Sequence, residues 1–283
     1  MTDKYLTLEK RIEAEVTSFS GKMCVYANDF KGNVIDVNAD EKFETASCIK
    51  LFILADLFNR IEKGQKSLDD ILEYNDLNYI NGSGILRNLD TGIKMTVKNF
   101  ATLMMIVSDN IATNIMIDYL GIESINDSVR EFGLKNTVLH NKIDFEMYSK
   151  LGTSTPREYG YIFEKIIQGM LVSKEASRQM LEILRKQHYN NMLTKSFPHY
   201  FLDSENTGDE EIIFTGSKSG SMNACRNDGG IVTTPYGSYV LVMFTKEFKD
   251  PLYYSEHEST VFGSKVSRLF FDQFLALEGR FKL

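Results

Sequence analysis

The two ends of the chain have the patterns of strands, whereas the long middle has the pattern of helices. An amphipathic first helix carries Leu6, Leu8, Ile12 and Val16, and GKMCVYANDF and NVIDVNAD follow as two strands around a KGN turn. Near the other end, EIIFTGSKSG, GGIVTTP and GSYVLVMFTK are strand-like, and residues 257–275 form a closing helix. We therefore expect an α/β fold in which the terminal parts form one antiparallel sheet flanked by helices.

From Ser47 to about Gln187 the pattern is mainly helical. Thr96 and Thr155 look like N-caps, with Pro156 at the first helical position, and Gly121 can end a helix. A polar loop, FPHYFLDSENTGDEE, follows. We expect a single domain over 1–283, with a sheet lobe at about 1–46 and 205–283 and an inserted all-helical lobe at about 47–204. A cleft between two lobes favours a small-molecule site.

Composition excludes several function classes. The net charge of −7 argues against nucleic-acid binding, and no apolar run is long enough to cross a bilayer. Three cysteines without paired spacing, and four histidines without ligand spacing, predict neither a disulfide framework nor a metal site. We expect no cofactor, and the pattern sets no oligomeric state. The start of the chain lacks a secretory segment, so we expect a cytoplasmic protein, or a secreted one if a leader was removed.

Ser47 and Lys50 form an S-x-x-K motif at the start of an apolar helix. A spacing of three places them on one helix face. A serine hydroxyl needs a base to become a nucleophile, and a lysine can be that base when burial and nearby cations lower its pKa. Alternatively, Ser47 is an N-cap and Lys50 a solvated helix residue, because an isolated S-x-x-K is common.

Two further motifs follow along the chain. Ser108-Asp109-Asn110 interrupts an apolar helix, so Ser108 could relay a proton and Asn110 could offer an amide to a substrate. The alternative is a simple connection between helices. In FTGSKSGSMN, Lys218 and Ser219 can bind a carboxylate and Gly220 lets a ligand approach the backbone. The alternative is a hairpin end with a solvated lysine.

The three motifs S-C-I-K, S-D-N and K-S-G, in this order, resemble those of class A β-lactamases and penicillin-binding proteins. The stretch at residues 82–121 and the segments INDSVREFGLKNT, STPREYG and RNDGGIVTTPYGSYVLVMFT continue the resemblance over nearly the whole chain. It implies the β-lactamase/transpeptidase fold, with the active site between the sheet lobe and the helical lobe.

The resemblance implies a role for each motif residue. Ser47 attacks the β-lactam carbonyl, Lys50 takes its proton, and Ser108 passes a proton to the leaving nitrogen. The oxyanion hole consists of the N–H groups of Ser47 and Ser221. The substrate-binding residues are Asn110, Lys218, Ser219, Gly220, Ser221 and Arg226. Arg226 could equally be a turn residue that faces solvent.

The chain departs from class A enzymes in the loop LHNKIDFEMYSKLGTSTPRE. It is shorter than the loop that carries the deacylating glutamate in those enzymes, and it lacks a Glu-Pro-Glu-Leu-Asn run. Asp144 and Glu146 are the acids available within it, as bases or as structural charges. Acylation is therefore better supported than fast turnover.

The sequence leaves three functions open. The first is a serine β-lactamase-like hydrolase that opens a β-lactam amide through an acyl-serine intermediate, with slow deacylation as one option. The second is a D-Ala-D-Ala peptidase, an esterase or a glutaminase-type amidohydrolase that uses the same serine-lysine pair. The third is a protein that binds β-lactams without turnover. In all three cases the partner is a small molecule, a β-lactam or an acyl amide or ester.

Overall fold

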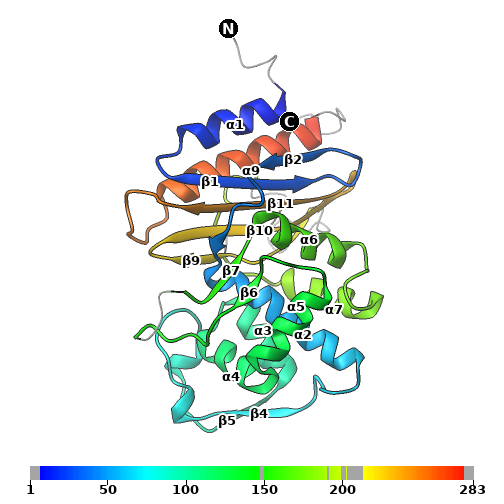
Figure 1. The fold of residues 1–283 in the computed structure, drawn as a ribbon, viewed down its shortest axis with the longest axis vertical. Coiled ribbons are helices and arrows are strands. Elements are labelled where there is room, and N and C mark those ends of the chain that lie inside the picture. The colour runs from blue at the N-terminus through cyan, green and yellow to red at the C-terminus, as the bar shows by residue number, and fades with distance from the viewer. Residues whose placement is uncertain (1–6, 147–149, 190, 199–201, 203–212, 277–283) are drawn as a thin grey trace.

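The structure, a computed structural model, describes residues 7–146, 150–189, 191–198, 202 and 213–276. An antiparallel sheet joins both ends of the chain, in the strand order β2-β1-β11-β10-β8 with β9 also paired to β10 (Figure 1). The strands are β1 (Lys22–Asn28), β2 (Val34–Val37), β8 (Phe214–Ser217), β9 (Gly220–Met222), β10 (Cys225–Thr234) and β11 (Gly237–Lys246). Because β1 pairs with β11 over its whole length, the predicted union of the terminal segments is confirmed.

Both faces of this sheet are covered. Helices α1 (Leu8–Ser18) and α9 (Glu258–Ala276) pack on one face, and α6 (Pro156–Ile167) packs on the other (Figure 1). Side chains of β11 alternate accordingly: Tyr239 and Leu241 join the core under α1 and α9, whereas Val240 and Val242 join the core under the helical lobe. A sheet buried on both faces needs apolar residues at every position, which explains the continuous run YVLVMF.

The helical lobe is built mainly from five helices. They are α2 (Lys50–Glu62), α3 (Val97–Ile106), α4 (Asn110–Leu120), α5 (Ile122–Glu131) and α7 (Lys174–Leu184). The predicted caps are confirmed: the Thr96 hydroxyl accepts from the Asn99 N–H and the Thr155 hydroxyl accepts from the Glu158 N–H. Gly121 ends α4 with a φ of 88°, a backbone conformation that favours glycine.

Short strands also occur between these helices. Strands β4 (Ile71–Tyr74) and β5 (Ile93–Thr96) form a ribbon, and β3 (Phe43–Glu44), β7 (Gly152–Ser154) and β6 (Val138–Leu139) form a second small sheet. Short 3-10 helices are η2 (Ala46–Ile49), η3 (Asp76–Asn78) and η4 (Leu86–Asn88). The division into lobes at residues 46–47 and 204–205 stays a prediction. Most of the expected polar loop, residues 199–201 and 203–211, lies outside the described residues.

Helix α2 is the centre of the helical lobe. Every residue from Lys50 to Asn59 is buried, as expected for a helix that is apolar around its circumference.

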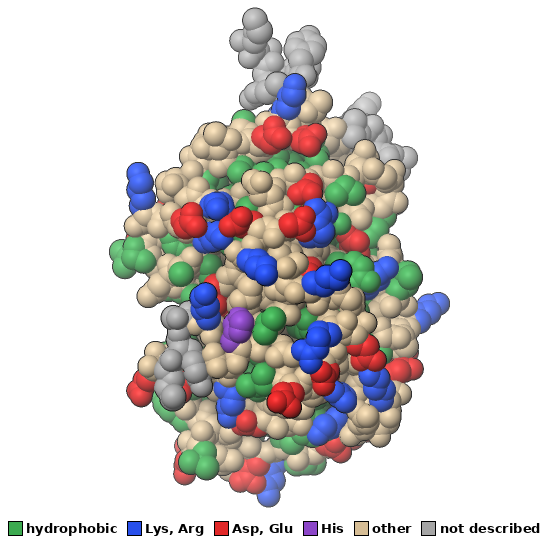
Figure 2. Space-filling model, viewed as in Figure 1, with side chains coloured by type: hydrophobic (Ala, Val, Ile, Leu, Met, Phe, Trp, Pro, Cys, Tyr) green, Lys and Arg blue, Asp and Glu red, His purple; other side chains and the backbone are tan. Residues whose placement is uncertain are grey.

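Charged pairs lie instead on the surface, where Figure 2 shows acidic and basic side chains interspersed. Exposed pairs such as Lys142–Asp118 contribute at most about 1 kcal/mol each, so the apolar cores hold the fold.

Candidate active site

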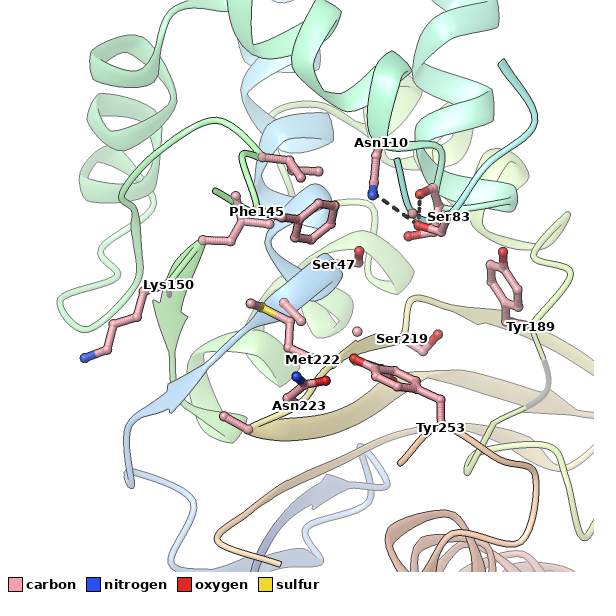
Figure 3. A pocket seen from close by; sticks show the side chains of 18 of the residues that line it. Ser47, Ser83, Asn110, Phe145, Lys150, Tyr189, Ser219, Met222, Asn223 and Tyr253 are labelled. Atoms are coloured by element: carbon pink, nitrogen blue, oxygen red, sulfur yellow. Dashed lines mark hydrogen bonds between the residues drawn. The ribbon is translucent and has the colours of Figure 1, made fainter. Parts of the chain in front are cut away.

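Ser47 and Lys50 lie on the turn that leads into α2. Ser47 belongs to η2 and is partly exposed in a pocket, whereas Lys50 begins α2 and is fully buried. Residues three apart in a 3-10 helix are stacked on one another, so the turn places both side chains on the same face. Figure 3 shows the Ser47 hydroxyl near the middle of the pocket.

The Lys50 side-chain nitrogen (Nζ) lies within hydrogen-bond distance of three oxygen atoms of the S-D-N segment. They are the Ser108 carbonyl oxygen at 2.8 Å, the Ser108 Oγ at 3.0 Å and the Asn110 Oδ1 at 3.0 Å. No carboxylate among the described residues pairs with it within 4.0 Å. Burial first, and then the charge of Lys218, hold the pKa of Lys50 well below its ordinary value. Lys50 is therefore suited to act as a neutral base.

Asp109 explains why the S-D-N segment turns as it does. Its Oδ1 accepts from the Ala112 N–H and caps α4, and its Oδ2 accepts from the N–H groups of Ile85 and Leu86. Ser108 consequently has a left-handed backbone, with a φ of 52°. The aspartate is thus a structural residue that directs its two neighbours toward Lys50.

Ser83 extends this network and was not predicted from the sequence. Its hydroxyl lies 2.7 Å from the Ser108 carbonyl oxygen and 3.1 Å from the Asn110 Oδ1. The Asn110 Nδ2 donates to the Asn81 carbonyl oxygen at 3.1 Å. Isolated serines in a loop carry no spacing signal, so only the three-dimensional contact identifies this residue.

The K-S-G segment connects β8 to β9 on the other side of Ser47. Lys218 is fully buried, and its Nζ donates to the Ser219 carbonyl oxygen at 2.6 Å. Burial lowers the pKa of Lys218 to about 8. The Tyr159 hydroxyl donates to the Lys218 carbonyl oxygen at 2.6 Å and so fixes the backbone of the segment. Lys218 is thus a second buried lysine, whose charge acts on Lys50.

Gly220 permits close contact between β9 and the Ser47 turn. A Cβ at Gly220 would lie 2.5 Å from the Thr45 carbonyl oxygen and 2.8 Å from the Ser47 nitrogen, so a side chain there would separate the two segments. Met222 pairs with Cys225 across a two-residue turn, which leaves Ser221 opposite Arg226 in a non-hydrogen-bonded pair. The Ser221 N–H therefore points away from β10, on the free side of β9.

These elements enclose a cavity of about 780 Å³. Ser47, Ser108, Asn110, Ser219, Gly220 and Ser221 all line it. Aromatic side chains stand at its edges: Figure 3 shows Phe145 and Tyr253 on opposite sides of Ser47, with Tyr189 at a third side. Residues of all three motifs therefore line one pocket, whereas the fully buried lysines Lys50 and Lys218 are not among the residues that line it.

The loop acids lie differently from each other. Asp144 lines the pocket, whereas Glu146 is exposed and is not among the residues that line it. Their neighbour Ile143 also lines the pocket and is 7% exposed. The Asn114 side chain accepts from the Ile143 N–H at 2.8 Å and donates to its carbonyl oxygen at 2.9 Å. An apolar side chain is therefore anchored in the pocket beside Asp144.

Arg226 lies outside the main pocket. Its guanidinium donates to the carbonyl oxygens of Cys225, Pro251 and Leu252 at 2.9–3.2 Å, and also to that of Met222. It stacks on the Tyr253 ring, with 4.0 Å between the guanidinium carbon and the ring centroid. The structure therefore connects Arg226 to the 251–253 segment, and through Tyr253 to the pocket wall.

The described part of the chain contains neither a metal-ligand cluster nor a helix that could span a membrane. No cluster of three or more histidine, cysteine or acidic side chains suited to a metal ion occurs there. None of the helices that the structure describes combines the length and apolar composition needed to cross a membrane.

Comparison with known proteins agrees with this geometry. The model of the beta-lactamase enzyme family matches residues 7–274. The β-lactamase of Bacillus amyloliquefaciens is 26% identical over 263 residues, 88% of this chain and 78% of that protein. The β-lactamase CARB-4 of Pseudomonas aeruginosa is 24% identical over 215 residues, 73% of this chain and 74% of that protein.

Solved structures share the fold. A β-lactamase from Sphaerobacter thermophilus superposes with a TM-score of 0.83 at 24% identity, over 95% of this chain and 97% of that one. PBP-A superposes with a TM-score of 0.80 at 26% identity, over 95% and 96%. With the three motifs assembled in one pocket and the family model spanning nearly every residue, the chain belongs to the beta-lactamase enzyme family, as a serine hydrolase of the class A type.

Proposed function

We propose that this protein opens the β-lactam ring through an acyl-serine intermediate at Ser47, and that it releases the acyl group slowly. One observation carries both halves of the proposal. Lys50 is buried beside Ser108 and Asn110 with hydrogen bonds to neutral oxygens alone. Burial and the nearby charge of Lys218 hold the pKa of Lys50 low, which favours a neutral amine that can deprotonate Ser47, and no carboxylate of the described residues pairs with Lys50 to activate water.

Acylation in this proposal uses the side chains of Ser47, Lys50 and Ser108. Lys50 takes the proton of Ser47 as the hydroxyl attacks the lactam carbonyl. As the lactam C–N bond breaks, Ser108 delivers its proton to the leaving nitrogen and recovers one from Lys50, whose Nζ lies 3.0 Å from the Ser108 Oγ. The N–H groups of Ser47 and Ser221 receive the developing oxyanion. The N–H at the start of a helix has no partner within the helix, and the Ser221 N–H points away from β10, so both are suited to this role.

Substrate recognition falls to the two sides of the pocket. On the helical side, the Asn110 amide lies beside Lys50 and offers a partner for the substrate's amide side chain. On the sheet side, Lys218 and Ser219 attract the ring carboxylate, and Gly220 keeps β9 close enough to Ser47 for both to act on one molecule.

Among the residues that the structure describes, we infer that no carboxylate is well placed to act as the deacylating base. Asp144 lines the pocket but accepts from the Glu146 N–H at 3.0 Å, and neither acid forms a hydrogen bond with Lys50. A relative supports the acylation half of the proposal: a leucine-to-glutamate variant of PBP-A, a protein 26% identical to this chain, has been solved as an acyl-enzyme with penicillin G. The alternative in which Asp144 or Glu146 serves as the base is decided by the first test below.

We expect a fluorescent penicillin to label the protein at Ser47, and nitrocefin to give a burst near one equivalent followed by a slow steady state. Mass spectrometry of the intact protein should show the adduct on the wild type and none on Ser47→Ala. Asp144→Asn and Glu146→Gln should leave the slow phase unchanged, because neither acid activates the water. Fast turnover without a burst, lost in either acid variant, would contradict slow release.

Ile143→Glu should accelerate deacylation. Asn114 anchors the backbone of Ile143, and Ile143 lines the pocket. A glutamate at position 143 therefore places a carboxylate beside the acyl group. A general base contributes roughly 10²–10⁴-fold in rate. The matched control is Ile143→Gln, which has a similar shape and no base. If the two variants deacylate at the same rate, position 143 does not face the hydrolytic water.

Acylation by an anionic penicillin should weaken as the pH rises through about 8. Burial lowers the pKa of Lys218 to about 8, so its ammonium is present below that pH and lost above it. We expect a falling limb in acylation efficiency on the basic side, measured by stopped-flow. The methyl ester of the same penicillin lacks the carboxylate and should show no such limb, and Lys218→Ala should remove it for the acid. An identical limb for acid and ester would exclude Lys218 as the anion partner.

Arg226 provides a test of how the carboxylate is held. Its guanidinium is committed to backbone carbonyl oxygens and to Tyr253, so Arg226→Ala should slow acylation by the penicillin and by its methyl ester to the same extent. Tyr253→Ala should reproduce the effect. If Arg226→Ala instead changes the acid-to-ester ratio by about tenfold, about 1.4 kcal/mol, the guanidinium contacts the substrate carboxylate.

A further inference from the structure

Glu44 is a partly buried carboxylate three residues before the nucleophile, and no motif of the chain includes it. Its Oε1 accepts from the Ala46 N–H at 3.1 Å, the Leu151 N–H at 3.0 Å and the Gly152 N–H at 3.2 Å. The segment between β6 and β7, residues 140–151, borders the cavity and is called the pocket loop below. One oxygen atom of Glu44 thus connects the turn before Ser47 to the end of the pocket loop.

The turn that Glu44 holds has an unusual backbone. Ala46 has a φ of 45°, in the left-handed region that residues with a side chain rarely adopt. Such a conformation persists only where surrounding contacts enforce it. The Ala46 N–H is fixed by Glu44, and on the opposite side the Asn227 Nδ2 donates to the Glu44 carbonyl oxygen at 2.8 Å. The next residue, Ser47, carries the attacking hydroxyl and an oxyanion-hole N–H.

The segment at the other end of the contact also borders the pocket. Leu151 lines the cavity together with Ile143 and Phe145, and Gly152 begins β7. A Cβ at Gly152 would lie 2.7 Å from the Thr45 hydroxyl, so the segment and the turn are in close contact. The Thr45 N–H also donates to the Gly152 carbonyl oxygen at 3.0 Å.

The second carboxylate oxygen has no partner. The Glu44 Oε2 is buried and accepts no hydrogen bond from the described residues. Burial raises the pKa of Glu44, and the titratable groups that interact with it electrostatically include the His140 imidazole and the Cys225 thiol of β10. A buried polar atom without a partner is unfavourable for stability, and the three hydrogen bonds to Oε1 offset part of that cost.

We propose that Glu44 is a positioning residue for the acylation step, which ties the Ser47 turn to the pocket loop at Leu151 and Gly152. The inference rests on the proposed acylation at Ser47. Because the same oxygen holds both segments, a displacement of the loop is transmitted to the backbone that orients the nucleophile. Misplacement of a reacting group by about 1 Å can reduce a rate by roughly 10²-fold.

The test compares Glu44→Ala with Glu44→Gln. Glutamine keeps an acceptor at the Oε1 position but places a buried NH₂ group where Oε2 has no partner, so it should lower the melting temperature while it keeps the acylation rate within about threefold. Alanine removes the acceptor, so the limiting acylation rate should fall by roughly 10–100-fold with little change in penicillin affinity. Glu44→Gln should therefore lose stability and keep its acylation rate, whereas Glu44→Ala should lose acylation rate.

Glu158→Ala is the matched control. Glu158 also accepts several N–H groups, from Lys135 and Asn136, but it does not contact the Ser47 turn. It should lower the melting temperature and leave acylation unchanged. Equal slowing in Glu158→Ala and Glu44→Ala, or a Glu44→Ala rate within threefold of the wild type, would overturn the proposal.

Hydrogen exchange distinguishes this inference from the proposed function. In Glu44→Ala the amides of Ala46, Leu151 and Gly152 should exchange at least tenfold faster than in the wild type, and in Glu44→Gln they should stay protected. This measurement requires no substrate. If the wild type forms no penicillin adduct, the proposed function is wrong, whatever the exchange rates are. If the adduct forms but the three amides exchange equally in wild type and Glu44→Ala, the tie through Glu44 is wrong.

Discussion

The site depends on the side-chain nitrogen of Lys50, which is buried at the start of α2, a helix whose first ten residues are all buried. A polar nitrogen in such a place is unfavourable unless polar atoms surround it, and here three oxygens of Ser108 and Asn110 do so. The requirement fixes where α4 begins, because these residues reach Lys50 only if the chain turns at Asp109. The position of the helical lobe against the nucleophile is thus set by the solvation of one side chain.

Two strained residues complete the arrangement. Ala46 and Ser108 both have left-handed backbones, with φ values of 45° and 52°, and each such residue is unfavourable by roughly 1–3 kcal/mol. Both belong to turns that present a serine hydroxyl to the pocket. In each turn a carboxylate that binds backbone N–H groups, Glu44 or Asp109, opposes the strain. The two acids therefore contribute geometry to the site, although neither belongs to a proton-transfer pair.

Much of the fold could be predicted from the sequence because its signals are local. Strand periodicity, caps at Thr96 and Thr155, and the three motifs are each visible within a few residues. The contacts of Ser83, Glu44 and Asn114 could not be predicted, because each joins segments far apart in the chain through a residue type that is common in loops. Arg226 shows the same limit: its position in a strand says nothing about the carbonyl oxygens of Pro251 and Leu252 that occupy its guanidinium.

Burial of Lys218 has a consequence for the energetics of ligand binding. With a pKa of about 8, the side chain is charged in only part of the molecules in a mildly alkaline solution. An anionic ligand stabilises the charged form, so its binding draws a fraction of a proton from the medium, about half a proton near pH 8. The buffer supplies that proton, and its heat of ionisation becomes part of the measured heat. Calorimetric enthalpies obtained in two buffers would therefore differ for a carboxylate ligand and coincide for an uncharged one.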